Sequence, residues 1–126
     1  MTCRYLIDAD CAIYAMDARY PALRARLGQC DPGEVGISAI SFAEIALGVA
    51  LAKPPSPRAL DRFIATIPLA PFDEAAARAY ARLPFKRARF DRLLAAHALS
   101  MQATVITRKT GDFRDVPGLR VEDWTE

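Results

Sequence analysis

The sequence predicts a single α/β domain with a central parallel sheet and helices on both faces. Short apolar segments alternate with amphipathic segments along the whole chain. This alternation is typical of parallel strands, because parallel neighbours need a crossover connection that is usually a helix. The length of 126 residues supports one hydrophobic core, and no linker or internal repeat divides the chain.

The predicted strands are short apolar runs that end at polar or turn-forming residues. Several of them lead directly into a segment with helical periodicity, as expected for a sheet covered on both faces. The predicted strands are residues 4–8, 35–40, 67–72, 103–107 and 119–121.

The predicted helices begin at residues that typically cap helices. Asp10 and Asp73 each supply a side-chain oxygen for the free N–H groups of a first turn. Ser41 and Glu44 are three residues apart, which is the spacing of a capping box. The predicted helices are residues 11–19, 21–27, 41–52, 74–82 and 90–101, with a further helix that begins at Ser56.

The composition excludes several classes of protein. With 52% hydrophobic and 25% charged residues, the chain is not of disordered type. Cys3, Cys11 and Cys30 have neither disulfide-framework nor zinc-ligand spacing, which fits a reducing compartment. No signal sequence or membrane-spanning run is present, so we expect a cytoplasmic protein without membrane contact. The net charge of +2 permits a nucleic-acid partner but does not require one.

Acidic residues stand where predicted strands give way to helices. In an open α/β sheet these junctions meet in one crevice at the carboxyl ends of the strands. Carboxylates gathered there would repel one another unless a divalent cation neutralised them. Oxygen ligands favour a hard cation, so Mg²⁺ or Mn²⁺ is expected and Zn²⁺ is not. The acids are Asp8, Glu44, Asp91 and Asp112.

Each acid also has an ordinary structural explanation. Asp8 can end a strand or cap a helix, and Glu44 can belong to the capping box. Asp91 lies in a first helical turn, where the helix dipole favours an acid, and Asp112 can cap a turn. Asp73 also follows a strand and opens a helix, so position alone does not select the metal ligands.

Four ordered segments resemble the PIN-domain nucleases. The order, the spacing and the total length are similar to those of the VapC-type toxins of bacterial toxin–antitoxin pairs, and the resemblance covers essentially the whole chain. The segments are Tyr5-Leu6-Ile7-Asp8-Ala9-Asp10, Ile40-Ser41-Phe42-Ala43-Glu44-Ile45-Ala46-Leu47-Gly48, Phe90-Asp91-Arg92-Leu93-Leu94-Ala95-Ala96-His97-Ala98-Leu99, and Thr107-Arg108-Lys109-Thr110-Gly111-Asp112-Phe113 with the residues to Trp124.

The resemblance implies that Asp8, Glu44, Asp91 and Asp112 bind the metal ion and form the catalytic site. Thr107 and Ser41 would orient these carboxylates through hydrogen bonds. The chain departs from the family at Asp10, where the family usually has Asn and where the acid either joins the site or caps a helix. It also departs at Lys109, where the family often has Asn or Asp, and it is shorter between Tyr80 and Asp91.

The resemblance further implies a Mg²⁺- or Mn²⁺-dependent endoribonuclease that acts as a toxin, dimerises and is held inactive by a cognate antitoxin protein. The alternatives are a PIN nuclease of RNA processing and a non-catalytic PIN-like module that binds RNA or protein. Retention of all four acids speaks against the non-catalytic module. Basic residues near the acids are candidates for binding RNA phosphates, with a solvated charged turn as the alternative for residues 86–89. His97 points away from Asp91 and is expected to be structural. The basic candidates are Arg87, Arg89, Arg92 and Arg108.

Overall fold

A computed structural model describes residues 3–87 and 89–126 of the chain. Its centre is a five-stranded sheet with the strand order β3-β2-β1-β4-β5, in which every neighbouring pair is parallel. The predicted parallel α/β architecture is therefore confirmed. The strands are β1 (Tyr5–Ile7), β2 (Val35–Ser38), β3 (Leu69–Ala70), β4 (Thr104–Ile106) and β5 (Val121–Glu122).

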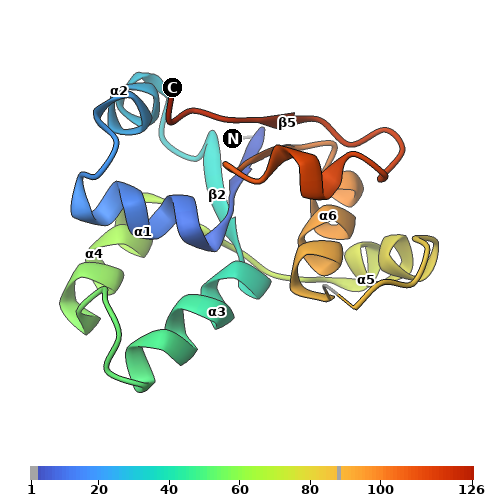
Figure 1. The fold of residues 1–126 in the computed structure, drawn as a ribbon, viewed down its shortest axis with the longest axis horizontal. Helices are drawn as coiled ribbons and strands as arrows, with labels where there is room; N and C mark the ends of the chain where they lie inside the picture. The colour runs from blue at the N-terminus through green and yellow to red at the C-terminus, as the bar shows by residue number, and fades with distance from the viewer. Residues whose placement is uncertain (1–2, 88) are drawn as a thin grey trace.

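Helices cover both faces of this sheet, as the sequence predicts. Figure 1 shows α1, α3 and α4 on one side of the strands and α5 and α6 on the other. No helix within residues 3–87 and 89–126 has the length and apolar character needed to cross a membrane. The helices are α1 (Ala9–Asp17), α2 (Pro21–Gln29), α3 (Ala39–Ala50), α4 (Pro57–Thr66), α5 (Glu74–Ala81), α6 (Arg89–Met101) and the 3₁₀ helix η1 (Thr110–Phe113).

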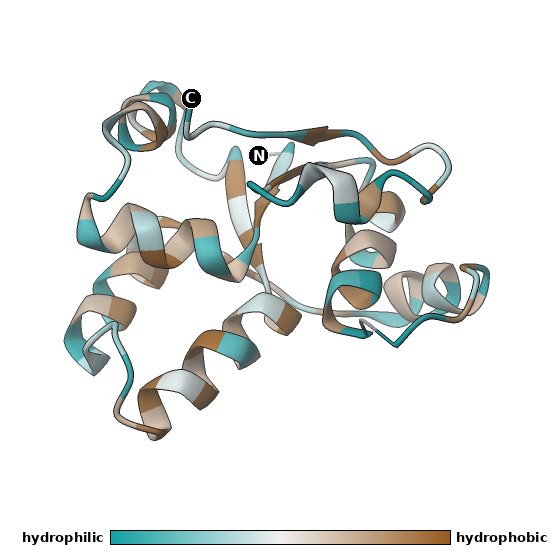
Figure 2. Ribbon diagram, viewed as in Figure 1, coloured by the Kyte–Doolittle hydropathy of each residue, from teal (hydrophilic) through white to brown (hydrophobic). Residues whose placement is uncertain are grey.

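The two faces of the sheet carry separate hydrophobic clusters. Ile7 and Ile37 pack with α1, α3 and α4, whereas Leu6 and Val105 pack with α6 and with Phe113 of η1. This division follows from the strand geometry, because successive side chains point to opposite faces. The strands are correspondingly hydrophobic in Figure 2. Phe113 and Trp124 are both buried and belong to these two clusters.

The cap of α1 differs from the sequence prediction. Asp8, not Asp10, is the N-cap residue, and its Oδ1 accepts a hydrogen bond from the N–H of Cys11 at 2.8 Å. The helix therefore begins at Ala9, directly after β1. The prediction that Asp10 caps this helix is wrong, because the strand passes into the helix with only one residue between them.

The start of α3 also differs from the prediction. Its N-cap is Ser38, whose Oγ accepts a hydrogen bond from the N–H of Ile40 at 3.1 Å. Ser41 and Glu44 consequently lie inside the helix, and the predicted capping box is not formed. The other predicted caps are confirmed, since Asp73 caps α5 and Ser56 caps α4.

Candidate active site

The candidate site lies where the strand order changes direction. Connections from β1 run outward to β2 and β3 on one side, whereas β4 and β5 lie on the other, so the switch point is between β1 and β4. Asp8 follows β1 and donates its backbone N–H to the carbonyl of Ile106 at 3.0 Å, while Thr107 follows β4. Open α/β sheets bind their ligands in this crevice.

Asp8 is a buried carboxylate, with only 4% of its surface exposed. Burial raises the pKa of Asp8, and the charge of Asp10 raises it further. Hydrogen bonds from Thr107 and Cys11 act in the opposite direction without cancelling the effect. The folded protein therefore disfavours the charged form of this carboxylate, mainly through burial.

Glu44 lies in the interior of α3, and Asp91 lies in the first turn of α6. Burial raises the pKa of Glu44, and the charge of Asp91 is the next largest cause. The charges of Asp10 and Asp8 raise the pKa of Glu44 as well. Glu44 is therefore under the influence of two other predicted acids, Asp8 and Asp91.

Asp10 is the additional acid near this cluster. Its side chain is exposed in the first turn of α1 and does not cap the helix. Its charge acts on Asp8, Glu44 and Lys109. Of the two roles open to Asp10 in the sequence, the structure favours the one beside the carboxylates.

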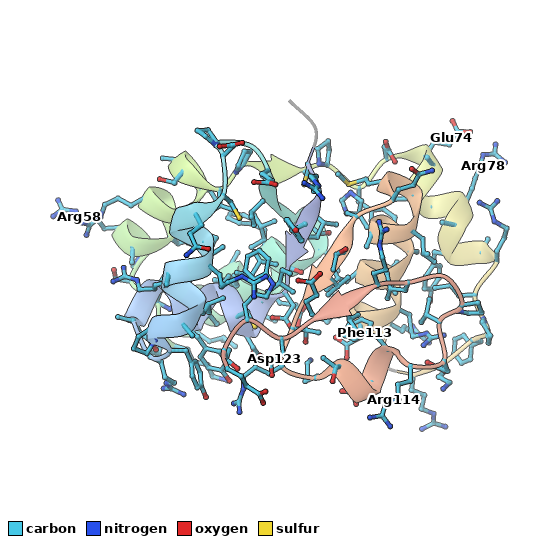
Figure 3. The ribbon with its side chains drawn as sticks, turned by 90° about the horizontal axis from the view of Figure 1, so that it is seen from above. Arg58, Glu74, Arg78, Phe113, Arg114 and Asp123 are labelled. Atoms are coloured by element: carbon cyan, nitrogen blue, oxygen red, sulfur yellow. The ribbon has the colours of Figure 1, made fainter. Side chains whose placement is uncertain are left out.

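Asp112, the fourth predicted acid, lies farther out. It is exposed in η1 and shares the lining of a pocket with Asp91 and Arg114. Figure 3 shows Arg114 extending outward from this segment. Asp112 is not among the main charges that act on Glu44. Asp112 therefore shares a pocket lining with Asp91 but not with Asp8 or Glu44.

Lys109 lies beside a predicted acid, although it was not among the candidate site residues predicted from the sequence. Its Nζ lies 3.3 Å from Asp91 Oδ1. Partial burial lowers the pKa of the Lys109 ammonium, whereas the negative charges of Asp91, Asp8 and Asp10 raise it. The charges have the larger combined effect, so the pKa of Lys109 is raised overall. The only sequence signal was the departure from the family's usual residue type at this position.

Thr107 and Ser41 differ in how well the structure supports their expected roles. Thr107 is fully buried, its hydroxyl lowers the pKa of Asp8, and its Oγ1 accepts the N–H of Lys109 at 2.9 Å. It therefore links the end of β4 to the carboxylate at the end of β1. Ser41 is also buried, but its Oγ has no hydrogen-bond partner among the described residues.

The structure contradicts the RNA-binding prediction for Arg92. This side chain is 3% exposed, and its Nη1 donates to Asp115 Oδ1 at 3.0 Å. Because Arg92 is buried and paired with Asp115, it offers little surface to a bound RNA. Arg87 and Arg89 are exposed beside Asp91, and Arg108 is exposed with its Nη1 donating to Tyr20 Oη at 2.8 Å.

His97 is part of the core and not of the site. It is 1% exposed, and its Nδ1 lies 2.7 Å from Ser38 Oγ. The ring of Phe72 packs edge-on against the imidazole, at 5.4 Å between centroids. The expectation of a structural histidine is confirmed.

The carboxylates border one crevice without converging on one point. Within residues 3–87 and 89–126, no group of three or more His, Cys, Asp or Glu side chains is placed to hold a metal ion as it stands. Their chemistry nevertheless fits a hard divalent cation, because all are oxygen donors. Burial is the main cause of the raised pKa values of Asp8 and Glu44, and a bound cation would favour their charged forms.

Comparison with known proteins agrees with this architecture. Residues 5–119 match the PIN domain family, and the chain belongs to that family. It is 26% identical to the tRNA(fMet)-specific endonuclease VapC of Shigella flexneri, over 97% of this chain and 98% of the relative.

Two solved structures extend the comparison. VapBC-1 from nontypeable Haemophilus influenzae has a TM-score of 0.80 and 26% identity, over 97% of this chain and 98% of that one. DNA-bound VapBC from Salmonella typhimurium has a TM-score of 0.81 at 24% identity, over 98% and 99% of the two chains, and shows the shared fold. The resemblance seen in the sequence is thereby confirmed.

Proposed function

We propose that this chain is a divalent-metal-dependent endoribonuclease and the toxin of a toxin–antitoxin pair. The observation that carries the proposal is the buried Asp8 at the switch point of the sheet, with Glu44 and Asp91 beside it. The full-length similarity to endonucleases of the VapC type supports the reaction class and RNA as the substrate.

Asp8, Glu44 and Asp91 are the proposed metal ligands, with Asp112 as the outermost candidate. Nucleases of this type generally need a divalent metal ion, and oxygen donors favour Mg²⁺ or Mn²⁺. When bound, such an ion polarises the phosphodiester and lowers the pKa of the attacking water. Asp8 is held in place for this role because its Oδ1 accepts the N–H of Cys11.

The proposed RNA contacts flank the acids. Arg87 and Arg89 lie on the exposed segment before Asp91, and Arg108 is held against Tyr20 after β4. Cations at these positions can hold backbone phosphates and fix the register of the strand without reading its sequence.

A cognate antitoxin is the proposed protein partner, and its proposed contact is the end of α3. Leu47 and Leu51 are 58% and 61% exposed there. They line one pocket together with Ile45 and Glu44, so a chain bound on this surface would reach the candidate site. Figure 2 shows that α3 remains hydrophobic away from the sheet. We further propose a homodimer and a cytoplasmic location.

The test is cleavage of a structured RNA pool with Mg²⁺, Mn²⁺ or EDTA. Wild type is expected to cut only with metal, and Asp8→Asn to lose at least about 100-fold in rate. Asp73→Asn is the matched control, because Asp73 also follows a strand and caps a helix but lies outside the site. Full activity in Asp8→Asn would overturn the site assignment.

Expression in cells separates the toxin from a nuclease of RNA processing. A toxin arrests growth, and coexpression of its antitoxin restores growth. Metal-dependent cleavage without growth arrest would favour RNA processing, and metal binding without cleavage would favour a non-catalytic module.

A further inference from the structure

Lys109 lies beside Asp91, with an exposed side chain and an anchored backbone. Its N–H donates to Thr107 Oγ1 at 2.9 Å, and its carbonyl accepts the N–H of Asp112 at 3.0 Å. Both backbone groups are therefore anchored between β4 and η1. From this anchor the side chain crosses to α6 and places Nζ 3.3 Å from Asp91 Oδ1.

Three cations near Lys109 in the sequence or the structure have partners outside the proposed metal ligands. Arg92 and Lys86 both pair with Asp115, and Arg108 contacts Tyr20. Among the ion pairs formed by the described part of the chain, Lys109–Asp91 is the one that includes a proposed metal ligand. Lys109 is also the cation that acts on Glu44.

We propose that the Lys109 ammonium takes the place of a second divalent ion, so that the site binds one metal ion and not two. This inference rests on the proposed metal site and adds its stoichiometry. Two-metal sites hold their ions about 3.5–4 Å apart and share carboxylate oxygens between them. An ammonium on Asp91 blocks that sharing sterically and repels a second dication.

The same ammonium remains available to the substrate. A single metal ion leaves part of the charge on a phosphodiester unneutralised, and an ammonium beside Asp91 is placed to offset it. A flexible lysine can do this as a point charge, without the bidentate geometry of arginine.

The experiment counts Mn²⁺ ions bound to the whole chain by electron paramagnetic resonance of free and bound Mn²⁺. Wild type is expected to bind one equivalent and Lys109→Met two, with the spin coupling of a close Mn²⁺ pair in the variant. Lys86→Met is the matched control, because it removes an ammonium paired with Asp115 instead of with a proposed ligand. It is expected to bind one equivalent.

The outcomes separate this inference from the proposed function. Two equivalents in wild type, or one in both wild type and Lys109→Met, would overturn the role of Lys109 but leave the metal site intact. No binding by wild type or either variant would overturn the metal site itself. If Lys109→Met fails to fold by circular dichroism, Lys109→Asn carries the same test.

Discussion

Asp8 meets two demands with one side chain. Its Oδ1 caps α1 through the N–H of Cys11, and its charge is the deepest of the carboxylate cluster. Capping needs only an acceptor oxygen, which Asn supplies equally well. Metal binding needs the negative charge. The substitution Asp8→Asn therefore separates the structural role from the chemical one.

The charge of Asp8 should lower the stability of the metal-free protein at neutral pH. Because folding raises the pKa of Asp8, the folded state holds a proton there more tightly than the unfolded state. The contribution of Asp8 to stability is complete below its ordinary pKa of about 4 and is lost as the pH rises through the raised value. In EDTA, Asp8→Asn should melt above wild type near neutral pH, and the difference should shrink toward about pH 4. Equal melting temperatures at neutral pH would contradict this account.

His97 provides the opposite pH dependence. Burial lowers the pKa of its imidazole, although Asp73 and the backbone of Pro71 partly oppose this. Its contribution to stability is present above the ordinary pKa of about 6.5 and is lost as the pH falls through the lowered value. We expect His97→Gln to lose less stability than wild type when the pH is lowered, as measured by thermal unfolding. Its rate of RNA cleavage should stay within about threefold of wild type. A large loss of cleavage in a folded variant would assign His97 to catalysis instead.

At the scale of elements, one buried cation connects α6 to the segment after η1. Within the described part of the chain, Nε and Nη2 of Arg92 have no hydrogen-bond partner, so the pair with Asp115 is the main compensation for its charge. Lys86 and Arg92 hold the pKa of Asp115 at about 2. Removing one partner of a buried charge is far more costly than breaking an exposed pair.

The corresponding prediction compares two carboxylates. Asp115→Asn should lower the midpoint of thermal unfolding by several degrees, because the Arg92 charge stays buried. Glu74→Gln should change it little, since Glu74 and Arg78 form an exposed pair at the outer edge of α5 (Figure 3). Comparable effects in the two variants would show that Arg92 gains little from Asp115.

The element boundaries show which features a single sequence can predict. The spacing of apolar residues was sufficient to predict the strands and the helices on both faces of the sheet. This spacing is set by which side chains must be buried against the sheet. The predicted starts of α1 and α3 were too late in the sequence, because the N-cap lies at the end of the preceding strand. Asp8 directly follows β1 and caps α1, and Ser38 is the last residue of β2 and caps α3. The burial of Arg92 and the reach of Lys109 depend on partners 23 and 18 residues away along the chain. No local pattern encodes such long-range pairs.

At the scale of the whole molecule, the sheet order concentrates negative charge in one crevice although the net charge is +2. A polyanion such as RNA must therefore be attracted by cations around the crevice. Arg87 and Arg89 lie on the segment next to Asp91 and are exposed. An arginine pair elsewhere on the surface would add the same charge without guiding a strand to the acids.

This difference can be measured as the salt dependence of RNA binding, in the Asp8→Asn background so that the RNA stays intact. The double variant Arg87→Ala/Arg89→Ala should bind RNA more weakly. The slope of log affinity against log salt concentration should become less steep, by about 0.7 for each single-strand phosphate that the variant no longer neutralises. Arg58→Ala/Arg62→Ala is the control of equal charge on α4, and Figure 3 places Arg58 at the opposite end of the molecule from Arg114. The control should leave the slope nearly unchanged. If both double variants flattened the slope equally, RNA would be held by the general positive charge of the protein and not by the segment beside Asp91.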